Sequence, residues 1–459
     1  MSIDVIVLAA GKGTRMRTGR AKVLHEAAGR TLLGWALASL EDIDTGDVAV
    51  VVGHQADEVA DACPDGVATV VQEPQLGTGH AVQVGLGGLT GTSGAVLVLP
   101  GDMPLIRAAT LRALVDRHET SGAAATILSV ELDDPHGYGR VIRSDGSVSA
   151  IVEERDATDD QRRIAEVNTS VYVFDAAALR SAVDELDDDN DQGELYLTDT
   201  IGILAERGAP IDAVIAPAVE GSGVNTQGQL AEVAAVLRGR INDDLLDAGV
   251  WMLDPSRVYI DADVVVAPGA MIHPDTYVVG TSAIGAGSEV GPGVQLHNTT
   301  VGEGARVQHA VAIDSEIGDR ALVGPFAYLR PGAVIREGAK VGTYVEVKAS
   351  EVGEGSKVPH LSYIGDTVIG SGSNIGAGTV TVNYDGYTKH KTTIGDGVRI
   401  GADTMLIAPV SVGDGAFTGA GSVITNDVPD GALAVERTSQ KNVDGYADKR
   451  RRRAEGDPS

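Results

Sequence analysis

The sequence predicts an α/β protein in which a domain with a mainly parallel sheet is followed by a parallel β-helix. Two observations predict this fold class. Across residues 1–226 short apolar runs alternate with helical patterns, and from about Val258 an aliphatic residue returns at every sixth position. Alternating strands and helices are typical of a parallel sheet, and a hexapeptide period is typical of a parallel β-helix.

The first domain is expected to span residues 1–226. The runs IDVIVLAA, VAVVVG and AVLVLPGD are predicted to be buried strands that end at loops containing Gly or Asp, while LLGWALASLEDI and RAATLRALVDRHET have helical spacing. Ligands of such sheets bind at the carboxyl ends of the strands. The loops that follow these runs are therefore the candidate site.

Residues 227–250 are predicted to be one helix, because Leu230, Val233 and Leu237 fall on one face. This helix is interpreted as a linker, although an ordinary domain helix would show the same pattern. The β-helix domain is expected over 251–445. The remaining residues, 446–459, contain the polar run ADKRRRRAEGDPS and are predicted to be a disordered tail.

The hexapeptide repeat fixes the geometry of the second domain. Three hexads make one three-sided coil of about 18 residues, with the aliphatic side chain inside. The first series of these aliphatic positions is Val266, Ile272, Val278, Ile284, Val290 and Leu296. The span 258–428 therefore holds roughly nine coils.

The repeat fails in the segment VTVNYDGYTKHKTTIGD, residues 380–396. Thr381 and Ile394 lie 13 positions apart, one more than two hexads, so the chain is expected to leave the coil as a loop. Such a loop could reach a neighbouring chain and build a site there, whereas a tolerated surface insertion would also break the repeat.

The bulk composition narrows the function classes. A net charge of −29 opposes general binding to nucleic acid or to an anionic membrane, so an anionic substrate would need locally clustered Lys and Arg. The only cysteine, Cys63, excludes an internal disulfide framework and fits a reducing compartment. No signal peptide and no apolar run of membrane length is visible, so we expect a cytoplasmic protein with no nucleic-acid or membrane partner.

The segment LAAGKGTRM, residues 8–16, follows a predicted strand. Its glycines would let backbone N–H groups approach phosphate oxygens, although a bare glycine turn has the same letters. The spacing of Gly11 and Gly13 is not that of a P-loop. Asp102 stands at another strand end and is a hard oxygen ligand suited to Mg²⁺.

Seven further motifs follow the glycine-rich segment in order along the domain: AKVLHEAAGRTLL, QEPQLGTGHAV, PGDMPL, GYGRVI, IVEERDAT, EVNTSVY and EGSGVN. Together they resemble the N-acetylglucosamine-1-phosphate uridylyltransferases, a branch of the sugar-nucleotide pyrophosphorylases. The resemblance implies a Rossmann-like nucleotidyltransferase domain that uses UTP and Mg²⁺. Two positions depart from the family pattern, Ala21 in place of Pro and Pro100 in place of Tyr.

The implied reaction joins two polyanions, since a sugar 1-phosphate attacks the α-phosphorus of UTP and expels pyrophosphate. The nucleophile is already anionic, so the demand is for charge neutralisation rather than for a general base. The resemblance assigns Arg15 and Lys22 to that neutralisation and assigns Asp102 and Asn225 to the metal. It also implies contacts to UTP or the sugar nucleotide from Leu8, Ala9, Ala10, Gly11, Lys22, Gln72, Gly77, Thr78, Gly139, Glu153, Asn168 and Asn225. Within this set the resemblance assigns Gln72, Gly77 and Thr78 to the uracil and ribose, and Gly139, Glu153 and Asn168 to the sugar.

The β-helix carries polar residues that a scaffold would not need, among them Arg330, Glu346, Lys348 and His360. Acetyl transfer to a sugar amine needs a proton acceptor, and histidine suits that role. The segments LRPGA, VEVKAS, VPHLSYIGD and NIGAGT, with the interrupted stretch, resemble the acetyltransferase half of the bifunctional uridylyltransferase/glucosamine-1-phosphate acetyltransferase family.

This second resemblance implies a left-handed β-helix, a homotrimer and acetyl-CoA as co-substrate. It makes His360 the proton acceptor, which Glu346 could orient. The implied contacts to glucosamine 1-phosphate come from Arg330, Lys348, Tyr363, Asn374 and Lys389. The implied contacts to acetyl-CoA come from Ala377, Asn383, Tyr384, Ala402, Ala420 and Arg437. Ala402 replaces a common Ser, and Glu436 beside Arg437 would weaken attraction to the phosphates of the cofactor.

Three alternatives stay open at the level of sequence. The β-helix could be a trimerisation scaffold on a pyrophosphorylase with one activity. The chain could be a regulatory subunit that keeps the folds, or it could act on another base and sugar, such as dTTP with glucose 1-phosphate.

Overall fold

The computed structural model describes residues 2–91 and 93–456. Its contacts divide the chain into two compact units, Met1–Ile241 and Asn242–Ser459. Among the described helices none is long and apolar enough to cross a membrane.

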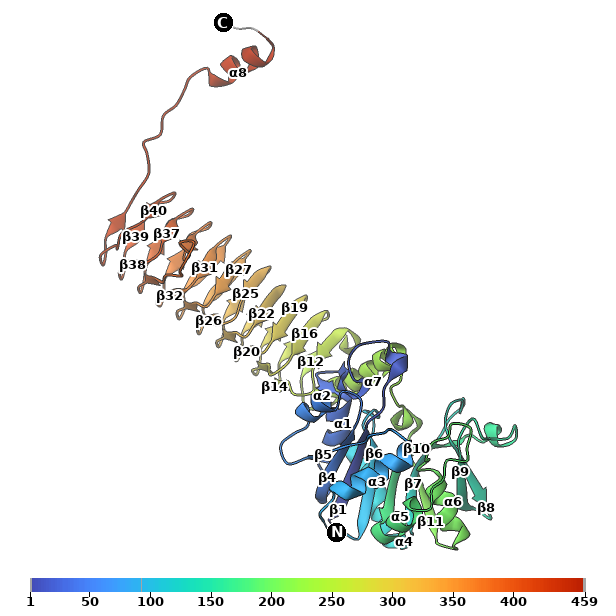
Figure 1. Ribbon diagram of the computed structural model, residues 1–459. Coiled ribbons are helices and arrows are strands. Elements are labelled where there is room, and N and C mark those ends of the chain that lie inside the picture. The colour runs from blue at the N-terminus through green and yellow to red at the C-terminus, as the bar shows by residue number, and fades with distance from the viewer. Residues whose placement is uncertain (1, 92, 457–459) are drawn as a thin grey trace. The chain divides into compact units, whose positions relative to one another are not determined.

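The first unit is built on one mixed sheet with the strand order β11-β7-β10-β6-β1-β4-β5 (Figure 1). Pairing is parallel between β1 and both of its neighbours, between β4 and β5, and between β7 and β11, whereas β10 runs antiparallel to β6 and β7. The strands are β1 Ile3–Ala9, β4 Thr45–Val52, β5 Ala68–Val71, β6 Ala95–Pro100, β7 Ala125–Glu131, β10 Glu166–Asp175 and β11 Ile211–Ile215, with β8 Arg140–Ser144 and β9 Ser147–Val152 attached to β10.

Both faces of this sheet are apolar, which explains why its strands are continuous runs of Val, Ile and Leu. Along β1, Val5 and Val7 belong to one core cluster and Ile6 belongs to the other. The helices of this unit are α1 Leu32–Ala38, α2 Ala56–Asp61, α3 Thr78–Gly88, α4 Ala108–Ser121, α5 Ala176–Val183 and α6 Asp199–Glu206, and the short β2 Glu26–Ala27 and β3 Arg30–Thr31 form a separate ribbon.

The predicted helix after this domain is α7, Gln227–Asp247. Its first half packs through Val233 and Leu237 on a core cluster that contains Met16 and Leu105. The boundary between the two units falls inside it, after Ile241. In the second unit, Asn242 donates to the carbonyl oxygens of Pro255 and Val258 at 2.8 and 3.0 Å.

The second unit is a β-helix of three parallel sheets, seen as a stack of coils in Figure 1. In the described residues one sheet has 11 strands, from β12 (Trp251–Met252) to β41 (Leu433–Ala434). The second has 10, from β13 (Val258–Ile260) to β40 (Val423–Ile424), and the third has nine, from β14 (Val265–Val266) to β38 (Val410–Val412). The aliphatic positions of the repeat point inward as predicted, and Val278, Leu296 and Val341 are fully buried.

The interior also holds buried hydroxyl groups that join successive coils. Ser356 donates to the carbonyl of Gly370 at 2.5 Å and accepts from the backbone N–H of Ser373 at 2.8 Å. Each such hydroxyl satisfies backbone groups at a corner where the strands end.

The end of the chain differs from the prediction of a disordered tail. Residues 446–454 form helix α8 (Tyr446–Ala454), whose described side chains are exposed and in which Arg451 pairs with Asp448 at 3.6 Å. Arg and Lys are good helix formers, so a run of them is compatible with a helix as well as with a solvated coil.

Candidate functional site

The strand ends of the first unit bring two predicted loops side by side. In the parallel pair β1 and β6, Leu8 is in register with Pro100, and the N–H of Gly101 donates to the carbonyl of Leu8 at 2.9 Å. The glycine-rich segment after β1 and the Asp102 turn after β6 therefore leave the same edge of the sheet. This is the edge at which α/β sheets bind ligands.

Four predicted residues from four separate segments meet at this edge. The Lys22 ammonium contacts the Asp102 carboxylate and donates to Asn225 Oδ1 at 3.2 Å. Arg15 Nη2 donates to the same oxygen at 3.0 Å. The backbone also ties these segments together, because Val224 N donates to the carbonyl of Asp102 at 3.0 Å.

The donor set at this cluster fits a magnesium ion. The oxygens of Asp102 and Asn225 both contact the Lys22 ammonium, and Asn225 also accepts from Arg15, so these oxygens already bind positive charge. Across the described residues no group of three or more His, Cys, Asp or Glu side chains could hold a metal. A Mg²⁺ ion here would therefore complete its shell with substrate phosphates and water, as Mg²⁺ commonly does.

Gly13 is the glycine on which the position of Lys22 depends. It has φ +57°, and a Cβ at this residue would lie 2.6 Å from the Cβ of Lys22. Gly11 is exposed, and a Cβ there would meet nothing within 4 Å. Of the other predicted phosphate-loop residues, Leu8 and Ala9 lie in β1, and the carbonyl of buried Ala10 accepts from Gln75 Nε2 at 2.8 Å.

The structure also brings together the three residues assigned to the base and ribose. Gln72 is buried, and its Nε2 donates to the carbonyl of Gly77 at 2.9 Å. Gly77 has φ +111° and lies so close to Leu195 that a Cβ would stand 2.6 Å from its carbonyl oxygen. The Thr78 hydroxyl accepts from Leu197 N at 3.0 Å. The Gln72 amide, the Gly77 carbonyl and the Thr78 hydroxyl thus each have a partner within the protein.

The three residues assigned to the sugar form a second cluster in this unit. The N–H of Asn168 donates to the carbonyl of Gly139 at 2.8 Å, and a Cβ at Gly139 would lie 3.4 Å from Glu153 Oε2. Burial raises the pKa of Glu153. The hydrogen bond of 3.1 Å that Thr198 Oγ1 donates to Glu153 Oε1 lowers this pKa, but by less than burial raises it. Sequence reasoning missed Thr198, which lies 45 positions from its partner.

In the second unit, the 10-stranded sheet presents two of the five residues assigned to the sugar phosphate, Lys348 and Tyr363. Strand β28 (Glu346–Lys348) pairs with β31 (Tyr363–Gly365), which sets Glu346 beside Tyr363. Lys348 Nζ donates to Asp366 at 2.7 Å, and Asn383 Nδ2 donates to the same carboxylate at 2.5 Å and to Tyr363 Oη at 3.4 Å. Asp366 is the functional candidate that sequence reasoning missed here.

Neighbouring positive charge and hydrogen bonds lower the pKa of Asp366. Burial alone would raise its pKa, but the pKa lies below its ordinary value because Lys348 and Asn383 bind the carboxylate and Lys389 adds positive charge. Lys389 is held near this cluster by the loop, in which it forms an isolated antiparallel bridge with Tyr384. The loop predicted from the broken repeat lies between β34 (Val380–Val382) and β35 (Thr392–Ile394).

Three residues assigned to acetyl-CoA, Ala377, Ala402 and Ala420, fall on one corner of the coils together with His360. Backbone N–H groups of Gly378, Asp403 and Gly421 donate to the carbonyls of His360, Ala377 and Ala402 at 3.4, 2.7 and 2.8 Å, so these positions stack in successive coils. Arg437 Nη1 donates to the carbonyl of Ala420 at 3.2 Å. His360 is exposed and is followed along the stack by three small side chains, Ala377, Ala402 and Ala420.

Two predicted associations do not occur within one chain. Glu346 accepts from Arg330 Nη1 at 2.9 Å and is thus paired with that residue rather than orienting His360. Asn374 lies in β33 (Asn374–Ile375), between Lys357 and Arg399 on the 11-stranded sheet, whereas Lys348 and Tyr363 lie on the 10-stranded sheet. A three-sided coil turns successive hexads onto different faces, and this separates them.

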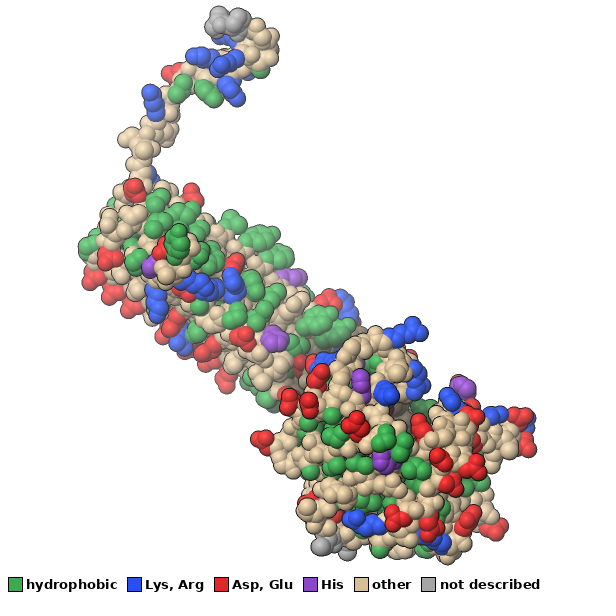
Figure 2. Space-filling view, in the orientation of Figure 1, with side chains coloured by type: hydrophobic (Ala, Val, Ile, Leu, Met, Phe, Trp, Pro, Cys, Tyr) green, Lys and Arg blue, Asp and Glu red, His purple; other side chains and the backbone are tan. Residues whose placement is uncertain are grey.

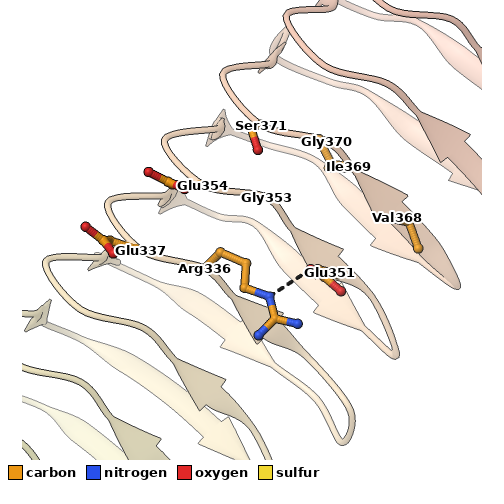
Figure 3. A pocket seen from close by; sticks show the side chains of 9 residues that line it. All are labelled: Arg336, Glu337, Glu351, Gly353, Glu354, Val368, Ile369, Gly370 and Ser371. Carbon is orange, nitrogen blue, oxygen red and sulfur yellow. Dashed lines mark hydrogen bonds and ion pairs between the residues drawn. The ribbon is translucent and has the colours of Figure 1, made fainter.

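A groove of about 330 Å³ lies on the remaining face, and none of the predicted residues line it (Figure 3). In it Arg336 Nε donates to Glu351 Oε1 at 2.7 Å. Glu337, Glu354 and Ser371 occupy successive positions on its corner, as the hydrogen bonds from Gly355 N to the Glu337 carbonyl and from Gly372 N to the Glu354 carbonyl show. The groove is therefore a feature of the coil corner and not of the predicted sites.

Each of the two units contains a segment that matches a known protein family. Residues 5–195 match the MobA-like NTP transferase domain, and residues 391–426 match the bacterial transferase hexapeptide (six repeats). The second unit is thus a left-handed β-helix of hexapeptide repeats.

Curated relatives match almost the whole chain. The bifunctional protein GlmU of Corynebacterium aurimucosum is 49% identical over 97% of this chain and 93% of its own length. The bifunctional protein GlmU of Streptomyces avermitilis is 48% identical over 97% of this chain and 94% of its own. A solved UDP-glucose pyrophosphorylase in complex with UDP-glucose covers 52% of this chain and 100% of its own at 14% identity, with a TM-score of 0.43.

Proposed function

Since the chain belongs to the family of bifunctional GlmU proteins, we propose that it catalyses two successive reactions on one amino sugar. The β-helix unit acetylates glucosamine 1-phosphate with acetyl-CoA. The α/β unit then transfers uridylyl from UTP to the resulting N-acetylglucosamine 1-phosphate, which gives UDP-N-acetylglucosamine and pyrophosphate. The single observation that carries the proposal is that each unit holds its own polar cluster, Lys22 with Asp102 and Asn225 in one and Lys348 with Asp366 and Asn383 in the other.

In uridylyl transfer a phosphate oxygen of the sugar forms a bond to the α-phosphorus of UTP, and the bond from that phosphorus to the bridging oxygen of pyrophosphate breaks. Arg15 and Lys22 would neutralise charge on the phosphates, a role supported by their convergence on Asn225. Asp102 and Asn225 would hold Mg²⁺, which when bound supplies positive charge to the same phosphates. Gly139, Glu153 and Asn168 would bind the sugar.

In acetyl transfer the amine nitrogen of glucosamine 1-phosphate forms a bond to the acetyl carbon, and the carbon–sulfur bond of the thioester breaks. His360 would take the proton that the amine loses, and the sulfur would leave as the thiol of CoA. The exposed position of His360, at the head of a column of small side chains, supports access for an extended cofactor. Arg437 would meet its phosphates.

The acetyltransferase site is proposed to be shared between chains of a homotrimer in the cytoplasm. Within one chain His360 lies in β30 (Lys357–His360) of the 11-stranded sheet, while Lys348 lies on the next sheet. Phe326, Tyr344 and Leu361 are 54%, 61% and 62% exposed, and Phe326 stacks on Tyr344 at 5.4 Å between ring centroids. Figure 2 shows such hydrophobic side chains along the β-helix. Exposed rings of this kind favour burial against another copy.

The test follows thiol release and pyrophosphate release separately in one reaction with glucosamine 1-phosphate, acetyl-CoA, UTP and Mg²⁺. His360→Ala should abolish thiol release and leave pyrophosphate release from added N-acetylglucosamine 1-phosphate intact, and Asp102→Asn should do the reverse. Thiol release unaffected by His360→Ala would favour a pyrophosphorylase with a scaffold β-helix. A monomer in sedimentation would contradict the shared site, and faster turnover of dTTP with glucose 1-phosphate would contradict the substrates.

A further inference from the structure

We propose that Tyr172 is a positioning residue for the sugar-phosphate substrate of the first unit, because its phenol anchors the side-chain amide of Asn168 and leaves the other polar atom of that amide for the sugar. The inference rests on the proposed function, in which Asn168 binds the sugar. Tyr172 itself would not touch the substrate. It would act by leaving Asn168 Oδ1 available as an acceptor for an N–H or O–H group of the sugar.

A bulge in β10 creates the contact. Opposite β7, Asn168 is in register with Ser129 and Tyr172 with Ile127, so four steps along β10 correspond to only two along β7. A regular strand rises about 3.3 Å per residue, so the bulge cuts the separation of the two positions along the strand from about 13 Å to about 7 Å. It also keeps both side chains on one face of the sheet. Ser170, inside the bulge, has φ +62°.

The phenol of Tyr172 has no access to water. Its side chain is fully buried in the core and lies 5.4 Å from the ring of Phe174, centroid to centroid. Burial raises the pKa of Tyr172, so the hydroxyl stays neutral and protonated. Such a group serves as a hydrogen-bonding partner, here to the side chains of Asn168 and Ser170, rather than as an acid or a base.

The side-chain amide of Asn168 binds the Tyr172 hydroxyl through its nitrogen. Nδ2 donates to Tyr172 Oη at 2.6 Å, while the side chain is only 5% exposed. Oδ1 is buried and has no hydrogen-bond partner among the described residues. An unpaired buried acceptor is costly, and a donor on a bound ligand would satisfy it. The neighbouring Gly139, whose carbonyl accepts from Asn168 N, places this oxygen in the sugar cluster.

The Tyr172 hydroxyl could instead contribute only to the stability of the fold. A positioning role and a purely structural role predict different changes in KM. Without the hydroxyl, the Asn168 amide would lose its anchor and could turn away from the sugar. Tyr172→Phe should therefore raise the KM for N-acetylglucosamine 1-phosphate about 5- to 10-fold, the worth of one hydrogen bond, with the KM for UTP and kcat changed less than twofold. Thiol release by the second unit of the same sample should be unchanged.

Thr126→Val is the matched control. It removes a buried hydroxyl from β7 of the same sheet, where Thr126 Oγ1 bonds to His118 Nδ1 at 3.0 Å. This variant should lower the unfolding temperature as Tyr172→Phe does, yet leave both KM values unchanged. An equal rise in KM in both variants would overturn the proposal.

A double-mutant cycle isolates the action through Asn168. In the background of Asn168→Ala, Tyr172→Phe should raise the KM for the sugar phosphate no further. A persistent effect in that background, or no effect in either, would overturn the proposal. Should Tyr172→Phe fail to fold, the wild-type protein gives the second readout: the Asn168 side-chain NH₂ should be protected from hydrogen exchange both with and without substrate, and rapid exchange would overturn it. An absence of pyrophosphate release in the wild-type protein would instead contradict the proposed function.

Discussion

Arg15 Nη2 donates a hydrogen bond of 3.0 Å to Asn225 Oδ1, although the two residues lie 210 positions apart in the chain. The same oxygen accepts from Lys22 at 3.2 Å. An oxygen proposed to bind Mg²⁺ is thus already shared by two cations. Binding of the metal and of UTP would exchange these protein contacts for contacts to phosphate.

This relationship predicts that Arg15→Gln impairs only the first unit. Loss of one preorganised charge at a phosphoryl-transfer site commonly costs about 100- to 1,000-fold in turnover. We expect pyrophosphate release to fall by that order and thiol release to remain at the wild-type rate. Arg20→Gln is the control, because Arg20 is exposed and its side chain pairs with Glu26 at 3.1 Å. A fall in both reactions of Arg15→Gln would indicate misfolding rather than lost neutralisation.

Asp366 predicts a complementary result in the second unit. Its carboxylate holds both Lys348 and Asn383, so Asp366→Asn would free two groups proposed to bind substrate. We expect the kcat/KM of acetyl transfer to fall about tenfold or more, because misplacement of positioning groups is costly in proportion to the binding energy that they direct. Pyrophosphate release from N-acetylglucosamine 1-phosphate and UTP should not change.

The control for Asp366 is Asp275→Asn, which removes the partner of Arg257 from the first coils of the same β-helix. Both side chains of that pair are more than half exposed. Thiol release that falls equally in the two variants would contradict a specific role for Asp366.

The repeat and the motifs predicted much of what the structure contains. A period of six requires a buried side chain once per face, and Val278 and Leu296 are accordingly inaccessible. The four segments that carry Arg15, Lys22, Asp102 and Asn225 could be placed together only through the family resemblance, since nothing local connects them. The break at residues 380–396 correctly predicted a loop, because an extra residue cannot be absorbed by a flat coil.

What sequence reasoning missed depends on contacts between successive coils or strands. Glu346 lies 16 positions after Arg330, nearly one coil, and so pairs with that residue instead of with His360. Asp366 looks like the turn residue of any hexad, and only the register of β28 and β31 shows that it faces Lys348. Tyr172 looks like an ordinary strand residue, because the bulge that brings it to Asn168 leaves no signal in the local pattern.

Asp199 predicts a pH-dependent stability of the first unit. Burial, followed by the negative charges of Glu153, Asp187 and Asp156, raises the pKa of Asp199 to about 6 from 3.8. A raised pKa in the folded state means that the neutral form contributes stability below about pH 4, and this contribution is lost as the pH rises through about 6. Asp199→Asn keeps the neutral form at every pH.

We therefore expect Asp199→Asn to unfold at a higher temperature than the wild-type protein at pH 8, with the difference shrinking below pH 6 and vanishing near pH 4. Thermal unfolding of the first unit across this range, followed by pyrophosphate release remaining after heating, is the measurement. Asp133→Asn, at an exposed position, should show no such dependence. A difference that is constant with pH would refute the assignment.

At one corner of the β-helix, Asp side chains accept hydrogen bonds from the backbone of the preceding coil. A Glu side chain at an equivalent position does not. Asp414 Oδ1 accepts from the N–H of Asp396 in the preceding coil at 2.8 Å, and Asp430 Oδ1 accepts from the N–H of Asp414 at 3.0 Å. Glu354 stands on the same corner, and none of the side-chain hydrogen bonds among described residues involves its carboxylate. The shorter Asp side chain reaches the backbone of the coil before it.

Asp414→Ala should therefore destabilise the second unit by about 1 kcal/mol, because water replaces the lost acceptor at this exposed corner. For a unit of this size that corresponds to a fall of about 2–4 °C in unfolding temperature. Asp414→Asn keeps an acceptor oxygen and should lose less than half as much, while Glu354→Ala should change nothing. Thermal inactivation of thiol release measures all three, and equal losses from Asp414→Ala and Glu354→Ala would show that charge on the corner matters rather than the bond between coils.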